Sequence, residues 1–431
     1  LSILICIFLV LYFGLLFLES RSVAVLRDFV VFSLLAGGLA AALLVPEVCA
    51  ILETDFSDMD FPKKLERYFS VLDILARHGV AVYNERGLAH WPNIYCGTPV
   101  FFLIPMYLTN PTIPVRKKFC NMALAGIFLF SFATNMTDFV WHGMNYPDSL
   151  PARQSFLYIF LVVVMCYEAF LYMDTVSERY ILYGYLSGVL FLLFCEKFVD
   201  TDHYETDIVF VSILFLTLFA ILVYLLRVKQ KKFDRQIIAY LLTIAVIAEV
   251  SVNSFVTSLG TVSRTSYVED WEDYKALYQY TKENGDPGIY RIEKFARKTK
   301  NDGTMLGYPT ASVFSSTMNS QVMDLYKKLG MLNSKVFYGY EGATPLVAAL
   351  LNVDWMFGKG KDYSNSLYRE EKKSGEISLY RVNDRLPFGF AAPVDWELPE
   401  NVTSIKLQNS LVKRLGFNES LFGFASARSE G

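Results

Sequence analysis

Charged residues are scarce in this chain: Asp, Glu, Lys and Arg account for 19% of its 431 residues, whereas 53% are hydrophobic. So little charge excludes an ordinary soluble protein of this length. The shortage is also uneven, because nearly every long apolar run lies before residue 251. The sequence therefore predicts a polytopic α-helical membrane domain over 1–251 and a water-soluble domain over 252–431.

Metal ligands and basic patches are sparse as well. The six cysteines are scattered through the first half without metal-ligand spacing, at Cys6, Cys49, Cys96, Cys120, Cys166 and Cys195. A disulfide framework and a zinc site are both disfavoured. We predict no cofactor or metal site, although a need for a divalent metal stays open. No basic stripe interleaved with aromatic residues is present, which argues against nucleic acid as a partner.

The first residues do not have the pattern of a cleavable leader. The chain begins at Leu1 inside an apolar run, with no basic segment and no small-residue cleavage site ahead of it. This pattern is not that of a signal peptide, and we expect a further part of the protein upstream.

What is present is a series of apolar segments. A helix that crosses a bilayer needs about 20 apolar residues, and seven segments fit clearly. An eighth, 98–113, is short and contains Pro105, so a re-entrant segment is the alternative. The predicted spans are 1–18, 29–52, 98–113, 119–136, 155–173, 180–195, 208–226 and 236–251.

The distribution of Lys and Arg favours all eight crossings. Basic residues then concentrate in the loops 19–28, 114–118, 174–179 and 227–235, whereas the short opposite loops hold only Arg153 and Lys197. Basic loops stay in the cytoplasm. The long loop 53–97 and the soluble domain are therefore predicted to be extracytoplasmic.

The soluble domain alternates short strand-like and helix-like segments, which predicts a small α/β or α+β fold. Strands are expected near 289–293, 353–357 and 377–382, and helices near 320–329 and 344–351. Residues 357–375 are rich in Gly and Lys and are predicted to form an exposed loop.

The most informative loop precedes the predicted span at 155–173. Asp148 or Ser149 can cap the following helix, and Pro151 suits its first turn, where Arg153 also stands. A helix start has free N–H groups and positive dipole character. Together with the Arg153 guanidinium, these helix-start N–H groups predict a binding site for a lipid phosphate.

Other side chains of the same loop allow two interpretations. His142, Asn145 and Asp148 are candidates to position or deprotonate a substrate hydroxyl. Alternatively, Trp141 and Tyr146 belong to an interfacial aromatic belt, His142 is a satisfied loop residue and Arg153 anchors a headgroup.

Three further features have structural alternatives. The acidic stretch 53–60 could act as a base or bind a cation, but a solvated loop is the simpler interpretation. The aromatic stretch 89–98 could stack on sugars, but is interpreted as a belt. Glu168 lies within an apolar span, and we expect it to hydrogen-bond to a neighbouring helix.

The loop carries the sequence Trp141-His142-Gly143, followed by Asn145-Tyr-Pro-Asp-Ser-Leu-Pro-Ala-Arg153-Gln-Ser-Phe. It resembles the corresponding stretch of the YfhO family of bacterial membrane proteins. The soluble half is similar to the family as well, at Tyr290-Arg-Ile, Phe314-Ser-Ser, Leu329-Gly, Leu350-Leu-Asn-Val-Asp-Trp and Asn383-Asp-Arg-Leu-Pro-Phe-Gly-Phe.

The resemblance implies a fold similar to the GT-C glycosyltransferases. These enzymes transfer a sugar from a polyprenyl-phosphate carrier to an acceptor outside the membrane, here a cell-envelope polymer such as teichoic acid. The family pattern places the catalytic carboxylate upstream of Leu1, so the catalytic residue is unknown, and it implies that the soluble domain is truncated on its C-terminal side. Arg153 is then the candidate for binding the donor phosphate, with His142 as helper.

Two other functions remain open. One is a transporter or flippase of a lipid-linked intermediate, although the sequence shows one Pro-broken span and no matching partner. The other is a non-catalytic envelope assembly protein, anchored by its helices.

Overall fold

The computed structural model describes residues 2–54, 61–83, 91–145, 152–199, 204–227, 235–258, 263–285, 288–389, 391, 399, 402–416 and 419–423. The chain forms two compact units. The membrane unit comprises Leu1–Ala41 and Met59–Thr261, and the C-terminal unit comprises Ala42–Asp58 and Val262–Gly431.

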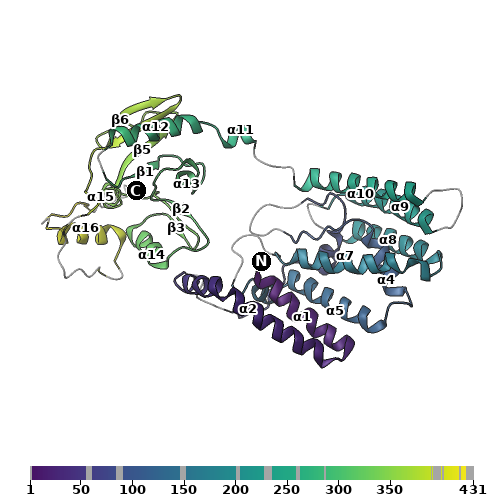
Figure 1. Ribbon diagram of the computed structural model, residues 1–431. Helices are drawn as coiled ribbons and strands as arrows, with labels where there is room; N and C mark the ends of the chain where they lie inside the picture. Colours follow the sequence, from purple (N-terminus) through teal and green to yellow (C-terminus); the bar gives the residue numbers. More distant parts are fainter. Residues whose placement is uncertain are drawn as a thin grey trace, which may run out of the picture. The chain divides into compact units, whose positions relative to one another are not determined.

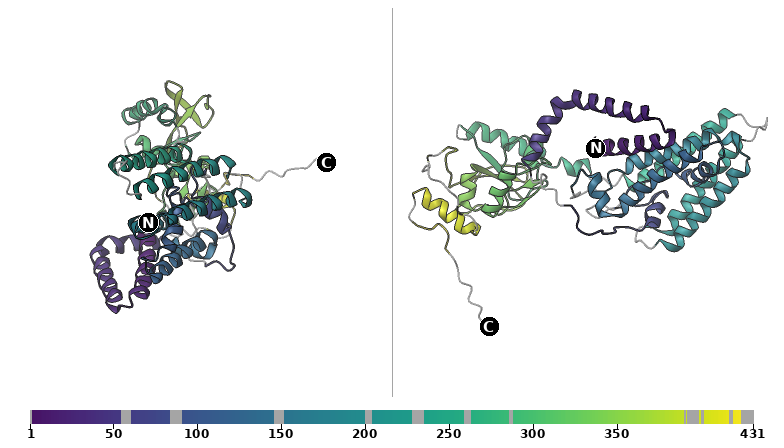
Figure 2. Two further views of the ribbon diagram at one scale, coloured as in Figure 1. Left: turned by 90° about the vertical axis from the view of Figure 1, so that its right-hand side faces the viewer. Right: turned by 90° about the horizontal axis from the view of Figure 1, so that it is seen from below.

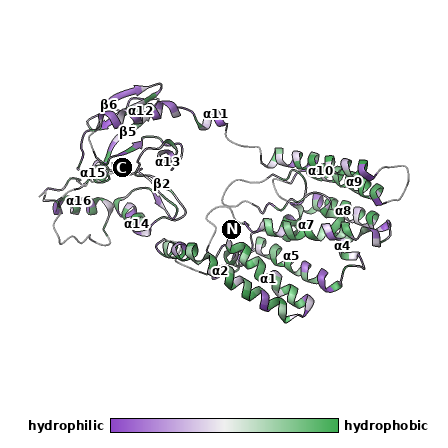
Figure 3. Cartoon of the chain, viewed as in Figure 1, coloured by the Kyte–Doolittle hydropathy of each residue, from purple (hydrophilic) through white to green (hydrophobic). Residues whose placement is uncertain are grey.

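The membrane unit is built of helices whose residues are predominantly apolar (Figures 1 and 3). In the described part of the chain, five helices are long and apolar enough to cross a membrane: α1, α2, α8, α9 and α10. How often the chain crosses stays a prediction. The helices are α1 (Ser2–Ser20), α2 (Val23–Leu52), α3 (Val71–Ala76), α4 (Val100–Thr109), α5 (Val115–Ala133), α6 (Asn135–Trp141), α7 (Ser155–Leu171), α8 (Arg179–Phe198), α9 (Thr206–Arg227) and α10 (Arg235–Thr257).

Helices α1 and α2 run side by side in opposite directions (Figures 1 and 2). Phe13 stacks on Phe29 across this pair, with ring centres 4.5 Å apart. Helix α2 belongs to both units, because its residues from Ala42 onward group with the C-terminal unit. The membrane domain was predicted to end at residue 251. In the structure the membrane unit ends at Thr261, because α10 continues to Thr257.

The predicted span 98–113 contains a helix of only ten residues, α4, which includes Pro105. At 1.5 Å per residue such a helix is about 15 Å long, roughly half the hydrocarbon thickness of a bilayer. Most of its side chains are buried. Helix α4 is therefore an internal element, packed against α7 and α8.

Two glycines of α8 allow α4 to approach closely. A Cβ atom at Gly184 would lie 2.7 Å from the carbonyl oxygen of Phe102, and one at Gly188 would lie 3.0 Å from that of Phe101. Small residues four positions apart are a common means of packing membrane helices.

We expect Gly184→Leu to separate these helices and to lower the apparent melting temperature of the purified protein by about 5 °C or more. The matched control is Gly126→Leu, because a Cβ at Gly126 meets nothing within 4 Å. Fluorescence-monitored unfolding in detergent measures both variants. Equal melting temperatures would show that the close contact contributes nothing.

The long loop 53–97, predicted to be extracytoplasmic, contributes a short buried helix to the membrane unit. Helix α3 follows Ser70, whose hydroxyl accepts a hydrogen bond from the Asp73 amide at 3.1 Å. The side chains of Ile74 and Ala76 are completely buried. Helix α3 packs against α5 and α8, because its apolar side chains need cover.

Glu168 of α7 forms a hydrogen-bonded ion pair with Lys117 of α5. The predicted hydrogen bond to a neighbouring helix is therefore confirmed. A carboxylate inside an apolar helix needs such a partner, because an unpaired charge there is costly.

The C-terminal unit contains two sheets with helices packed on them (Figure 1). The larger sheet has the order β1-β5-β7-β6, in which β1 and β5 are parallel and the other pairs antiparallel. The smaller sheet has the order β2-β4-β3. The strands are β1 (Arg291–Lys294), β2 (Val313–Phe314), β3 (Asn333–Ser334), β4 (Phe337–Tyr338), β5 (Val353–Lys359), β6 (Tyr368–Ser374) and β7 (Ile377–Val382).

Helix α12 packs against β6 and β7, and α14 packs against α16. The helices of this unit are α11 (Arg264–Tyr267), α12 (Trp271–Asn284), α13 (Asp302–Leu306), α14 (Ser320–Leu329), α15 (Pro345–Leu350) and α16 (Ser404–Arg414). Mixed strand directions with helices packed around the sheets are typical of an α+β fold.

The prediction of an exposed loop over 357–375 was wrong for much of this segment, because β5 continues to Lys359 and β6 occupies Tyr368–Ser374. Strand β6 lies at the edge of the larger sheet. Its charged, largely exposed sequence resembles a loop because edge strands use charge to avoid pairing with other chains.

Candidate functional site

The loop that carries the sequence motif begins in α6, and its side chains are more buried than predicted. Trp141 is 3% exposed and stacks on Phe128 at 5.0 Å between ring centres. The interpretation of Trp141 as an interfacial belt residue was therefore wrong. His142 Nδ1 lies 2.8 Å from the backbone oxygen of Asp138 and 3.3 Å from its Oδ1 atom.

The Nε2 atom of His142 is buried without a hydrogen-bond partner. His142 is thus held by Asp138 within α6 and its C-terminal turn, and only its second nitrogen remains to act on a ligand. Asn145 is half-buried at the end of this turn. Asp148, Tyr146, Ser149 and Pro151 lie outside the described residues.

Arg153 precedes α7 rather than standing in its first turn. The helix begins at Ser155, and its N-cap residue Gln154 makes no side-chain cap hydrogen bond. The amides of Ser155, Leu157 and Tyr158 already donate to the carbonyl oxygens of Ala152 and Gln154. Arg153 is exposed. A phosphate bound here would therefore depend on the guanidinium more than on the helix amides.

A second candidate site, which was not predicted from the sequence, is a cavity within the membrane unit. A cavity of about 410 Å³ opens between α3, α4, α5, α7 and α8. We call it the His78 cavity. Its walls are mainly apolar, and its polar members are His78, Tyr158 and Ser187. An apolar cavity with few polar groups is the usual form of a site for a small or chain-like ligand.

His78 presents one nitrogen without a partner. Its Nδ1 atom lies 2.9 Å from the carbonyl oxygen of Leu75, which can only accept a hydrogen bond, so Nδ1 carries the proton. The Nε2 atom is buried without a hydrogen-bond partner. Burial lowers the pKa of His78, which lies in the segment between the spanning helices, to about 4. At neutral pH, Nε2 is therefore a buried hydrogen-bond acceptor.

The backbone that follows His78 is held by side chains of α9 and α10. Ser212 Oγ accepts a hydrogen bond from the Val80 amide at 3.0 Å, and Asn253 Oδ1 accepts one from the Ala81 amide at 3.0 Å. Glu249 Oε1 accepts one from the Thr98 amide at 2.7 Å. Ser212, Glu249 and Asn253 are buried, so these bonds fix both ends of 80–98 inside the unit.

Arg77 holds the same segment from the other side. Its guanidinium donates to the carbonyl oxygens of Pro92 at 3.0 Å and Tyr83 at 3.1 Å, and lies 5.7 Å from the centre of the Trp91 ring. Trp91 also stacks on Phe69 at 3.8 Å. Trp91, predicted as part of an interfacial belt, therefore packs within the protein.

Aromatic contacts connect the His78 cavity to the motif loop. The His78 ring lies 5.6 Å from Tyr158, and Tyr158 lies 6.1 Å from Phe128, which stacks on Trp141. Gln154, the N-cap residue of α7, donates to Ser131 Oγ at 3.0 Å. The two sets of candidate residues thus share one packed core.

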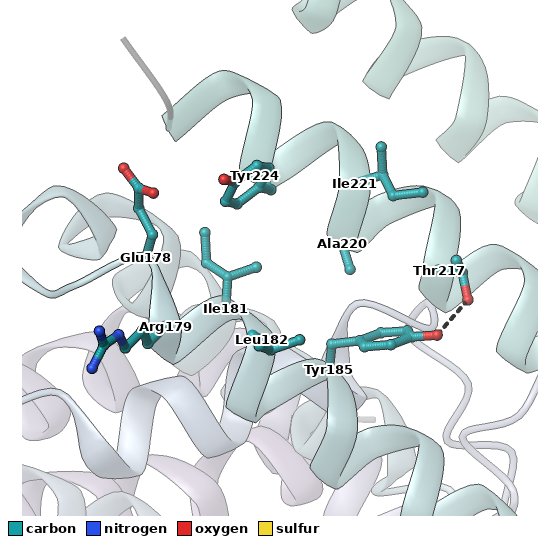
Figure 4. Close-up of a pocket in the computed structure, with 9 residues that line it drawn as sticks. All are labelled: Glu178, Arg179, Ile181, Leu182, Tyr185, Thr217, Ala220, Ile221 and Tyr224. Atoms are coloured by element: carbon teal, nitrogen blue, oxygen red, sulfur yellow. Dashed lines mark hydrogen bonds between the residues drawn. The ribbon is translucent and has the colours of Figure 1, made fainter. Parts of the chain in front are cut away.

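A larger groove of about 520 Å³ lies between α8 and α9 and differs from the His78 cavity in its polar groups (Figure 4). Its two inner polar groups, the hydroxyls of Tyr185 and Thr217, are hydrogen-bonded to each other at 3.0 Å. Leu182 and Ile221 on its walls are more than half exposed. This groove offers apolar surface to surrounding lipid but no unsatisfied buried group.

Among the described residues, no group of three or more His, Cys, Asp or Glu is placed so that it could hold a metal ion. In the acidic stretch 53–60, only Glu53 and Thr54 are described. The backbone oxygen of Glu53 accepts a hydrogen bond from the Ser320 amide at 3.0 Å. The rest of this stretch lies outside the described residues.

Long apolar helices packed around a buried polar segment define a polytopic helical membrane protein. A family model described as bacterial membrane protein YfhO matches residues 1–420. The chain therefore belongs to the YfhO family. No curated protein and no solved structure matches it.

Sequence reasoning missed His78, Ser212, Glu249 and Asn253. One signal was available: Glu249 is an acidic residue inside a predicted span, as Glu168 is, and such residues are functional candidates by default. The others carry no comparable signal, because a single Ser, Asn or His at a segment's end is common. Their role is visible only once distant segments are brought together.

Proposed function

We propose that this membrane protein is a glycosyltransferase of the GT-C type, which transfers a sugar from a polyprenyl-phosphate carrier to a cell-envelope polymer such as teichoic acid. Transfer takes place on the outer face of a bacterial inner membrane, and the C-terminal unit is extracytoplasmic. The observation that carries this proposal is the His78 cavity, an apolar space inside the membrane unit with one unsatisfied buried nitrogen.

The cavity suits a ligand with an apolar chain and a polar end. The apolar walls solvate isoprene units, as lipid does. His78 Nε2 faces the polar end, where it accepts a hydrogen bond from a hydroxyl or, once protonated, donates one to a phosphate. Arg153 is the further phosphate-binding residue in this proposal, with His142, Asn145 and Asp148 as candidates to position the acceptor hydroxyl.

The experiment that tests this function starts in the producing bacterium. The full-length gene is deleted, and the sugar content of purified envelope polymers is compared by mass spectrometry. Loss of one sugar from one polymer, restored by the wild-type gene, is expected. An unchanged polymer profile would contradict transfer and favour an assembly role.

Transport of a lipid-linked intermediate is the second candidate, favoured by the same apolar cavity. The two functions differ in where the lipid-linked sugar accumulates. A strain without a transferase collects the carrier-linked sugar outside, whereas a strain without a flippase collects it inside. Labelling the carrier-linked sugar with a membrane-impermeant reagent distinguishes them.

Arg153→Ala is expected to lower the affinity for the carrier about tenfold, because a charge-assisted contact with phosphate is lost. Lys197→Ala is the matched control, since Lys197 is an exposed cation in the last turn of α8, at an end that is predicted to be outside. Binding of a fluorescent polyprenyl phosphate to the purified variants provides the measurement. If both variants bind like wild type, Arg153 is a headgroup anchor.

A further inference from the structure

The C-terminal unit contains a pocket of about 230 Å³ that the proposed transfer reaction does not use. It lies beyond the carboxyl ends of the parallel strands β1 and β5, which end at Lys294 and Lys359, and beside the start of α12 at Trp271. The carboxyl ends of parallel strands are a frequent place for ligand sites. The volume is below the range typical of sites for drug-sized ligands, so a single small ring fits best.

Four cations line the pocket. Lys294 and Lys359 pair with carboxylates that also line it, whereas Arg297 pairs with Glu293 and Glu341 outside the pocket and Lys298 Nζ donates to the carbonyl oxygen of Ser266. Lys294 Nζ lies 2.9 Å from Asp302 Oδ2, and both side chains are nearly buried, at 5% and 6% exposure. Lys359 Nζ lies 2.5 Å from Asp270 Oδ2, with Glu269 at 3.8 Å. A phosphate would have to compete with carboxylates already in place, so the pairing disfavours an anion.

The paired groups still offer hydrogen bonds. An ammonium group has three N–H donors, and one of those of Lys294 is used by Asp302. Burial lowers the pKa of Lys294, which Asp302 opposes by favouring its charged form. Asp302 also accepts from the amides of Lys298 and Thr299, which fixes its orientation. Rigid charged donors and acceptors suit the hydroxyl groups of a neutral ligand.

Aromatic rings supply the remaining wall. Trp271 is half-buried at the start of α12, and the Tyr267 ring lies 6.0 Å from it. Lys294 Nζ lies 3.7 Å from the centre of the Tyr274 ring, which holds the ammonium at the base of the aromatic wall. Aromatic faces combined with fixed polar groups match a sugar ring, which has apolar C–H faces and hydroxyl edges.

We propose that this pocket binds a single uncharged sugar ring, through stacking on Trp271 and hydrogen bonds to Lys294 and Lys359. The site is separate from the His78 cavity, and binding here does not depend on transfer in the membrane unit. It would give the C-terminal unit its own affinity for glycosylated polymer.

Saturation-transfer difference NMR on the purified full chain tests this proposal. The probes are the methyl glycosides of glucose, galactose and N-acetylglucosamine, with glycerol 3-phosphate and methyl phosphate as anionic probes. The detergent must lack a sugar headgroup, because such a headgroup would compete. We expect saturation transfer to at least one methyl glycoside and none to the anions.

Trp271→Ala and Lys359→Met are expected to weaken glycoside binding about tenfold or more. Lys361→Met is the matched control, because Lys361 lies two residues further along and does not line the pocket. Lys359→Met replaces a side chain near the surface, so it tests the site even if Trp271→Ala unfolds the unit. Absence of glycoside binding, binding of the anions alone, or equal binding by the Lys359 and Lys361 variants would each overturn the proposal.

Discussion

Replacing His78 with phenylalanine is expected to reduce sugar incorporation into the envelope polymer about 100-fold, the lower range for loss of a group that exchanges a proton or a hydrogen bond with substrate. Phenylalanine keeps a ring against Tyr158 and Phe101, which His78 contacts now. It removes the unpartnered Nε2 atom. Polymer composition by mass spectrometry, in the deletion strain carrying the variant gene, gives the readout.

The matched control is Tyr185→Phe, which removes a hydroxyl from the groove between α8 and α9. It is expected to leave sugar incorporation unchanged. Normal incorporation by the His78 variant, at normal protein abundance, would remove His78 from the reaction.

His78 also predicts how carrier binding depends on pH. In the free protein, burial holds its pKa near 4, so the imidazole is neutral at pH 7. A bound phosphate favours the charged form and raises this pKa. Binding then takes up a proton, so the affinity of wild type should rise as the pH falls toward 4 and level off below it. The phenylalanine variant should lose this dependence.

The second large effect is expected at Glu249. Glu249→Ala leaves the Thr98 amide without its acceptor, and Thr98 is completely buried. An unsatisfied buried amide costs about 1–3 kcal/mol, so the apparent melting temperature should fall by roughly 5 °C. Carrier binding should fall as well, because Thr98 leads directly into α4, which lines the His78 cavity.

Glu249→Gln is the informative companion variant, since its amide oxygen can still accept from Thr98. It is expected to keep most of the stability that Glu249→Ala loses. Glu196→Ala, at an exposed acidic position of α8, is the neutral control. If Glu249→Ala and Glu196→Ala unfold at the same temperature, Glu249 does not hold the segment 80–98.

The sequence predicted the elements that local patterns determine. Helix α14 and strand β7 occupy the predicted ranges, because Asn319 caps the helix and the short strand-like segment Ile377–Val382 is rich in β-branched and aromatic residues. The hydrogen bond of Glu168 to a neighbouring helix was predicted from its place in an apolar segment. Hydropathy likewise located the long helices α8, α9 and α10.

Tertiary packing decided the rest. Segment 70–98 has the composition of a loop, yet α3 is buried because α5 and α8 cover it and because distant side chains satisfy the backbone that follows. Tryptophan is common at membrane interfaces, but Trp141 stacks on Phe128 inside the unit. Neither contact leaves a periodic signal in the sequence, since the partners lie far along the chain or on another helix.

The most direct test of the central claim is to locate the carrier. A polyprenyl phosphate with a photoreactive group in its isoprenoid chain is bound to the purified protein and irradiated, and the adducts are mapped by mass spectrometry. The account predicts adducts at the walls of the His78 cavity, on Ile104, Leu129 or Val162, which unlabelled carrier suppresses. Adducts confined to the groove between α8 and α9, or adducts that excess carrier does not suppress, would contradict it.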